Sequence, residues 1–169
     1  MSRESSEAVR RSRTPRTPAS PVPTDPPGAE LTFRLGFLLK HAQQRLYELS
    51  AEALAPYGIS GRELAVLLVL DALGPTSQQD AARRLGVDRT TMVALIDGLE
   101  AKSLVVRRPY EEDRRRNVVE FTERGHELFE KALAASDEAE RRFLCSLDDE
   151  SAERFRAQLR MMIGIESES

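Results

Sequence analysis

Hydrophobic residues recur at three- and four-residue steps over much of the chain, the spacing that places side chains on one face of an α-helix. The first such segment covers about residues 31–55 and ends at Pro56 and Gly58, two residues that stop helices. A second covers about 60–73, and its run LAVLLVL is apolar around most of the helix, which predicts a buried element. The stripe of the first segment comprises Leu35, Leu38, Leu39, Ala42, Leu46, Leu49 and Ala53.

Two short helices joined by a tight turn are expected next. Thr76 or Ser77 can cap the first helix, and Gly86 suits the left-handed backbone at its end. Asp88 can cap the second helix, in which the apolar residues stand at i, i+3, i+4 and i+7: Met92, Leu95, Ile96 and Leu99. This arrangement predicts a helix-turn-helix.

Two strands, 104–108 and 117–121, follow the helix-turn-helix, with a charged loop between them. Helical spacing resumes over 123–163, with a break before about Asp148. The sequence therefore predicts a mainly α fold with a small β-hairpin wing, an α+β arrangement. Residues 60–122 form a winged helix-turn-helix lobe, flanked by helices over 31–55 and 123–163.

The two chain ends differ from the rest in composition. Residues 1–30 contain TPRTPASPVPTDPPG and several arginines, which predicts a disordered tail. An auxiliary arm that touches nucleic acid is the alternative interpretation of these arginines. Residues 164–169 are expected to be a flexible C-terminus.

Composition excludes several classes of protein. No apolar run is long enough to cross a bilayer, and no apolar segment follows the N-terminal arginines, so neither a membrane span nor a secretory signal is expected. We therefore expect a cytoplasmic protein. One cysteine excludes an internal disulfide, and two histidines in different elements give no metal-ligand spacing. Without a catalytic motif, we expect no enzyme, no cofactor and no metal.

Charge is distributed unevenly along the chain. The whole chain has a net charge of -3. Residues 76–122 carry nine basic and eight acidic residues, whereas seven basic residues face twelve acidic ones from Glu123 onward. Contact with an anion is therefore expected in the middle.

A winged helix-turn-helix places its second helix in the DNA major groove. Opposite its apolar stripe, this helix offers Arg89 for a guanine, two threonines for bases or phosphates, and two small apolar side chains for thymine methyls. The N-terminus of the first helix can hold a phosphate. The candidate contacts are Ser77, Gln78, Arg89, Thr90, Thr91, Val93 and Ala94, with Asp97 on the same face.

The loop between the strands carries Arg114, Arg115 and Arg116 side by side. A narrow minor groove attracts inserted arginine, so we expect this hairpin tip to contact the groove next to the recognition helix. Asp113 can pair with an arginine and hold the tip in shape. A solvated loop that neutralises its own charges is the alternative.

The stretch DRRRNVVEFTERG, residues 113–125, resembles the wing signature of the MarR family of winged-helix regulators, with Asp113 and Arg115 on its paired acid and arginine. VDRTTMVALIDGLEAKSLVVR is similar to the recognition helix and following strand of that family. The resemblance covers 31–163. It implies an obligate homodimer formed by 31–55 and 123–163. It also implies a transcriptional regulator, usually a repressor released by a small phenolic or anionic ligand.

The resemblance also places an effector cleft beside the first helix. Arg45 can hold a carboxylate there and His41 a hydroxyl, with Tyr47 and Tyr57 as further candidates. A salt bridge, a half-buried histidine and packed tyrosines are the alternatives. We expect Cys145 to lie near a bend between helices as a buried, inert thiol.

A homodimer is expected to read a palindromic double-stranded operator with half-sites ~10 base pairs apart. The competing hypothesis is a winged-helix module that binds another protein and no DNA. The near balance of charge over 76–122 leaves room for it. Salt dependence separates the two hypotheses, because DNA affinity falls steeply as salt rises.

Overall fold

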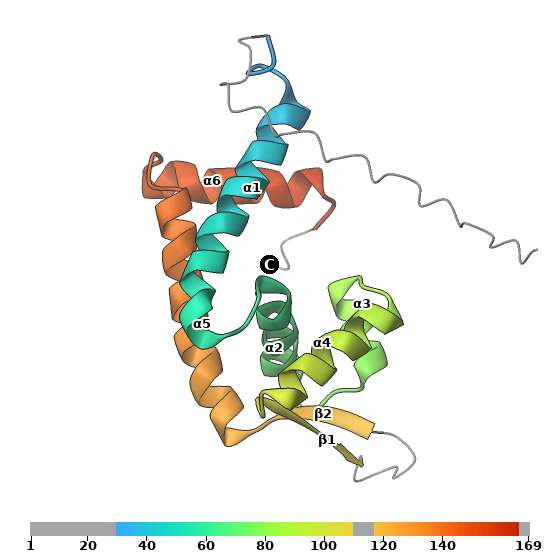
Figure 1. The fold of residues 1–169 in the computed structure, drawn as a ribbon. Coiled ribbons are helices and arrows are strands. Elements are labelled where there is room, and N and C mark those ends of the chain that lie inside the picture. The colour runs from blue at the N-terminus through green and yellow to red at the C-terminus, as the bar shows by residue number, and fades with distance from the viewer. Residues whose placement is uncertain (1–29, 110–116, 166–169) are drawn as a thin grey trace, which may run out of the picture.

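The computed structural model describes residues 30–109 and 117–165. Helices account for most of these residues, and two antiparallel strands form a hairpin (Figure 1). The mainly α fold with a small β-hairpin is confirmed. The elements are α1 (Leu35–Leu54), the 3₁₀ helix η1 (Ala55–Tyr57), α2 (Gly61–Leu73), α3 (Gln78–Leu85), α4 (Arg89–Ala101), β1 (Val105–Pro109), β2 (Asn117–Phe121), α5 (Glu123–Phe143) and α6 (Asp149–Met162).

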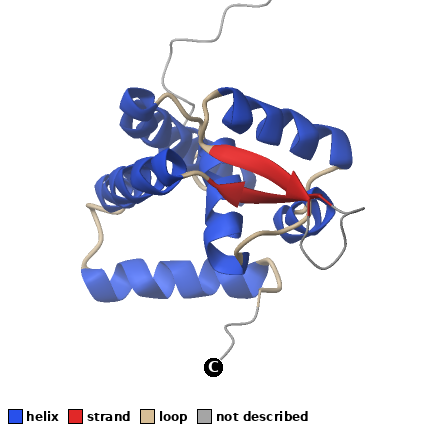
Figure 2. Cartoon of the chain, turned by 90° about the horizontal axis from the view of Figure 1, so that it is seen from below, coloured by secondary structure: helices blue, strands red, loops and turns tan. Residues whose placement is uncertain are grey.

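The elements form two regions. One region is a compact lobe of α2, α3, α4 and the β1–β2 hairpin (Figure 1). We call the hairpin the wing. α1 and α5 lie side by side, and α6 crosses them at the end of the molecule away from the wing. Seen from the wing end, the two strands lie across the helices of the lobe (Figure 2).

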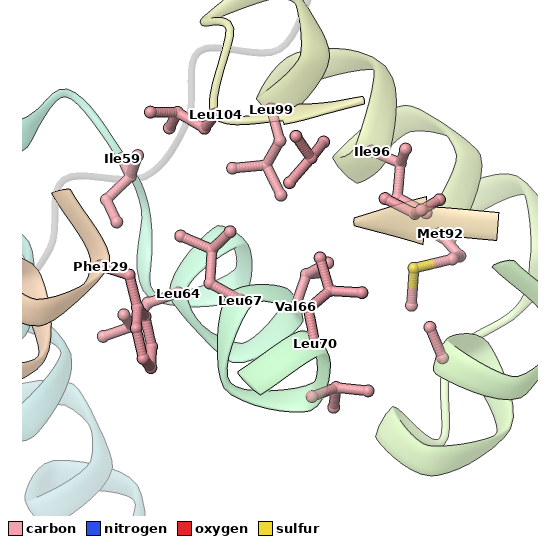
Figure 3. Close-up of a cluster of buried hydrophobic side chains, with 14 of the residues drawn as sticks. Ile59, Leu64, Val66, Leu67, Leu70, Met92, Ile96, Leu99, Leu104 and Phe129 are labelled. Atoms are coloured by element: carbon pink, nitrogen blue, oxygen red, sulfur yellow. The ribbon is translucent and has the colours of Figure 1, made fainter. Parts of the chain in front are cut away.

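The core is centred on α2, as its apolar circumference predicts. Val66 and Leu67 are fully buried, and Met92, Ile96 and Leu99 of α4 pack against the same cluster (Figure 3). Phe129 of α5 closes the other side. The core therefore fixes α4 on one side of α2 and the long helix α5 on the other.

The wing is tied to α3 as well as to itself. β1 and β2 pair from Val105↔Phe121 to Pro109↔Asn117, one residue later than expected for the first strand. Thr76, just before α3, forms an isolated bridge with Val119: its N–H donates to the Val119 carbonyl (3.1 Å) and its carbonyl accepts from the Val119 N–H (2.8 Å). This bridge fixes the start of α3 against β2.

Thr122 joins the wing to α5. Its hydroxyl caps α5 by accepting from the Gly125 N–H (2.9 Å) and donates to the Ser103 carbonyl (2.8 Å). Its own N–H donates to the Leu104 carbonyl (3.1 Å). Ser103 has a φ of 58°, a left-handed conformation that is uncommon for serine. One threonine thus connects β1, β2 and α5.

The first helix is shorter than expected. It begins at Leu35, whereas apolar spacing predicted a start at Leu31. A turn closed by the Arg34 N–H and the Leu31 carbonyl (3.0 Å) precedes it. Apolar spacing alone does not distinguish such a turn from the first turn of a helix.

The described segments contain no single helix with both the length and the apolar character to cross a bilayer. Residues 35–57 and 61–73 reach the required length and apolar character only when they are counted as one segment, and a bend of 74° separates them.

Candidate nucleic-acid interface

The recognition helix α4 begins with a well-made cap. The Asp88 carboxylate accepts from the Thr91 N–H (2.9 Å) and from the Thr91 hydroxyl (2.6 Å). The Thr91 hydroxyl, and then its N–H, hold the pKa of Asp88 below its usual value. The Thr91 hydroxyl, expected to reach bases or phosphates, is therefore already engaged in the cap.

The two sides of α4 are sharply divided. Met92, Ile96 and Leu99 are buried, whereas the candidate contacts Arg89, Thr90 and Ala94 are exposed, with Val93 and Thr91 half-buried. The exposed face is the one that a major groove would meet. All five of these candidates therefore lie at or near the surface of one helix, with Arg89 and Thr90 at its N-terminus.

α3 presents its N-terminus beside α4. The Ser77 hydroxyl accepts from the Asp80 N–H (3.1 Å) and donates to the Asp80 carboxylate (2.6 Å). Gly86 ends α3 with a φ of 66°, in the left-handed region expected from the sequence. Arg83 lies one turn from Asp80 and pairs with it at 3.3 Å.

A hollow of about 700 Å³ lies where α3, the start of α4 and the loop end of β2 meet. It brings together Ser77 and Gln78 of the α3 N-terminus and Arg89 of the α4 N-terminus, all three candidates from the sequence. N-termini of helices attract anions, and the lining supplies several hydrogen-bond donors. The complete lining is Ser77, Gln78, Gln79, Ala82, Arg83, Val87, Arg89 and Asn117.

Sequence reasoning missed the other five members of this lining: Gln79, Ala82, Arg83, Val87 and Asn117. Arg83 and Gln79 stand one turn apart on α3, a spacing that was available as a signal. Asn117 directly follows the arginine run and opens β2. The remaining candidates Asp113, Arg114, Arg115 and Arg116 lie outside the described residues.

One arginine of the wing is bound to the recognition helix. The Arg107 guanidinium in β1 donates to the carboxylates of Asp97 and Glu100 in α4. The next residue, Arg108, pairs with Glu120 of β2 at 2.7 Å. The wing is therefore linked to α4 by charge as well as by the core.

The four candidate effector residues do not share one cavity. His41 is exposed and packs against Phe37 with ring centroids 4.1 Å apart, and Arg45 pairs with Glu48 at 3.8 Å. Tyr47 is exposed over a surface hollow on α1. Tyr57 is half-buried against the core, beside a separate hollow next to α5.

Cys145 and His126 lie apart from both groups of candidates. Cys145 lies in the bend between α5 and α6 as expected, but its burial was predicted wrongly, because the residue is exposed. His126 is exposed and stacks on Phe121 with ring centroids 4.3 Å apart. Within residues 30–109 and 117–165, no three His, Cys, Asp or Glu side chains gather as a metal site.

A model of the MarR family matches residues 57–116. The chain is 29% identical over 118 residues to the HTH-type transcriptional repressor NicR of Pseudomonas putida, a match that covers 70% of this chain and 75% of NicR. It is 30% identical over 112 residues to the uncharacterized HTH-type transcriptional regulator YwoH of Bacillus subtilis, covering 66% and 81%.

The fold matches solved structures of the repressor CouR in two states. CouR bound to a 23-mer DNA duplex aligns with a TM-score of 0.75 and 29% identity, covering 83% of this chain and 99% of CouR. CouR from Rhodococcus jostii bound to p-coumaroyl-CoA aligns with a TM-score of 0.70 and 28% identity, covering 82% and 98%. The similarity therefore extends over both the winged lobe and the flanking helices.

Proposed function

Because the chain belongs to the MarR family of winged-helix regulators, we propose that it is a sequence-specific repressor that binds double-stranded DNA as a homodimer and is released by a small ligand. The observation that carries DNA binding is the hollow of about 700 Å³ where the N-termini of α3 and α4 meet the loop end of β2. A phosphate can lie there while α4 enters the major groove.

Each candidate side chain has a distinct role in this proposal. Ser77 and Gln78 position the duplex through a phosphate, and Arg89 and Thr90 reach base edges from the start of α4. Val93 and Ala94 meet thymine methyls. Arg114, Arg115 and Arg116 contact the minor groove, with Asp113 pairing to one of them. Thr91 contributes chiefly through the cap that it forms with Asp88.

The homodimer is supported by apolar side chains that the described chain leaves uncovered. Only the C-terminal half of the α1 stripe is packed within the chain. Large apolar side chains remain exposed at the start of α1 and the end of α6: Leu31, Phe33, Leu35, Leu38, Leu39, Met161, Met162, Ile163 and Ile165. A second copy related by a two-fold axis covers such a surface. It also presents two recognition helices to a palindromic operator.

The proposed effector contacts lie on α1 and on the 3₁₀ helix that follows it. CouR binds p-coumaroyl-CoA in a solved structure, which supports an aromatic, acidic ligand for this chain. Arg45 and His41 are exposed on α1, where they can reach a carboxylate and a hydroxyl. Tyr47 and Tyr57 are further candidates, although they border different hollows. Thermal-shift measurements with aromatic acids test this assignment, since a ligand raises the unfolding temperature of the protein it binds.

DNA binding is tested by selecting genomic fragments with the purified protein and measuring their affinity by gel shift. Arg89→Ala should weaken binding by about 1–3 kcal/mol, the value of one bidentate base contact. Arg154→Ala on α6, which removes the same charge from an exposed pair with Glu150, should leave affinity unchanged. A protein that retained no fragment at low salt would instead support the module that binds other proteins.

A further inference from the structure

The recognition helix carries acidic side chains on its groove-facing side. Thr90, Ala94 and Asp97 are all exposed and stand at i, i+4 and i+7, so they share one face of α4. Glu100 follows one turn after Asp97 and is half-buried. An uncompensated carboxylate at this position repels DNA phosphates.

One arginine holds both acids. The Arg107 guanidinium donates through Nη2 to Asp97 and through Nη1 to Glu100. The Arg107 backbone N–H also donates to Glu100, at 3.4 Å. The Arg107 side chain is 23% exposed, against 58% for Asp97 and 39% for Glu100. The guanidinium therefore lies between the acids and β1, with both terminal nitrogens engaged within the protein.

We propose that Arg107 is a positioning residue that neutralises Asp97 and Glu100, and thereby allows the face of α4 to approach a duplex. This inference rests on the proposed DNA binding. It assigns to Arg107 a role different from that of Arg89: Arg89 acts on DNA, whereas Arg107 acts on the charge of the helix that reads DNA. The ion pairs of Arg107 also link the wing to α4. Neutralisation of the two acids must therefore be separated by experiment from orientation of the wing.

The test measures affinity for a duplex that the wild-type protein has selected from its source genome. Arg107→Gln should bind about ten-fold more weakly at low salt, since two carboxylates then face the phosphates. Arg107→Lys retains the charge and should recover most of this loss. Arg141→Gln is the matched control, because it removes the same charge from an exposed pair within α5.

Neutralising the acids distinguishes charge compensation from orientation of the wing. Asp97→Asn with Glu100→Gln should restore the affinity of Arg107→Gln. In the wild-type background, the same two changes should leave affinity equal or higher, since a positive charge is released. If the ion pairs served only to hold the wing, these changes would weaken binding, which would overturn the inference.

Other outcomes are equally decisive. If Arg107→Gln bound the duplex as tightly as the wild-type protein does, the inference would be overturned and the proposed function would stand. Failure of the wild-type protein to bind any duplex would overturn the proposed function, and the inference with it. Thermal unfolding of each variant shows whether it folds. If Arg107→Gln does not fold, the result for the two neutralised acids in the wild-type background decides.

Discussion

Gly125 in α5 packs directly against the carbonyl group of Leu104, so closely that a β-carbon on the glycine would lie 1.9 Å from that oxygen. The side chain of Phe121 lies 3.1 Å from the same point. This contact holds the start of α5 against the base of the wing.

Replacing this glycine should therefore destabilise the fold, although alanine normally favours a helix. We expect Gly125→Ala to lower the free energy of unfolding by about 2 kcal/mol or more, because a backbone carbonyl must move. Urea unfolding measures the change. Gly61→Ala at the start of α2, where nothing lies within 4 Å, should have little effect. Equal stability of both variants would contradict the contact.

Glu63 should make stability depend on pH. Its carboxylate accepts from Lys102 Nζ (2.6 Å) and from the Ser60 N–H (2.8 Å). Burial, the largest single influence, raises its pKa, but the bonds from Lys102 and Ser60 together lower it below the ordinary value of 4.5. The stabilisation is therefore complete above about pH 4.5 and is lost as the pH falls through the lower folded pKa.

Glu63→Gln should remove this pH dependence. The variant should be less stable than the wild type at neutral pH, by about 1–2 kcal/mol, since a hydrogen-bonded carboxylate is lost. The difference should narrow as the pH falls below 4.5. Denaturant unfolding at a series of pH values measures both effects, and a constant difference between pH 7 and pH 3 would argue against the assigned pKa shift.

Two aspartates cap helices in the same way, and comparing their variants distinguishes an effect on stability from an effect on DNA binding. Asp88 caps α4 through the Thr91 N–H (2.9 Å), and Asp148 caps α6 through the Ser151 N–H (2.8 Å). Alanine at either position should lower the unfolding temperature by a few degrees. Asp88→Ala alone should also reduce DNA affinity severalfold, because it loosens the turn that carries Arg89. Gel shifts and thermal unfolding of both variants test this difference.

The homodimer can be tested with two equally exposed leucines. Leu38 on α1 is 48% exposed and Leu73 on α2 is 47% exposed. Leu38→Glu places a charge in the proposed interface and should weaken dimerisation about ten-fold or more, because a buried charge is costly. Leu73→Glu should leave the dimer intact. Sedimentation at several concentrations measures both, and an unchanged dimer in Leu38→Glu would place the interface elsewhere.

Much of the fold could be predicted because its boundaries are local. Ser77 and Asp88 cap their helices through residues three positions away, and Gly86 takes the left-handed conformation that its place predicts. Part of the lining of the hollow could also be predicted. Ser77, Gln78 and Arg89 stand at the N-termini of two helices, and the capping residues locate these N-termini in the sequence.

Other features could not be predicted because they depend on contacts distant in sequence. The bridge between Thr76 and Val119 pairs one residue with one other residue, so it produces no repeating pattern of apolar positions in the sequence. The pairing of Arg107 with Asp97 depends on how the wing folds back on α4. The exposure of Cys145, in the bend between α5 and α6, could not be read from helical spacing, which does not extend across the bend.

The hydroxyl of Thr122 bonds at once to the first turn of α5 and to the backbone that leads into β1. A single residue, hydrogen-bonded on both sides, therefore joins the hairpin to the long helix. If the helix and the hairpin move as one rigid body, a tilt of a few degrees at the far end of α5 displaces the wing sideways without any local unfolding.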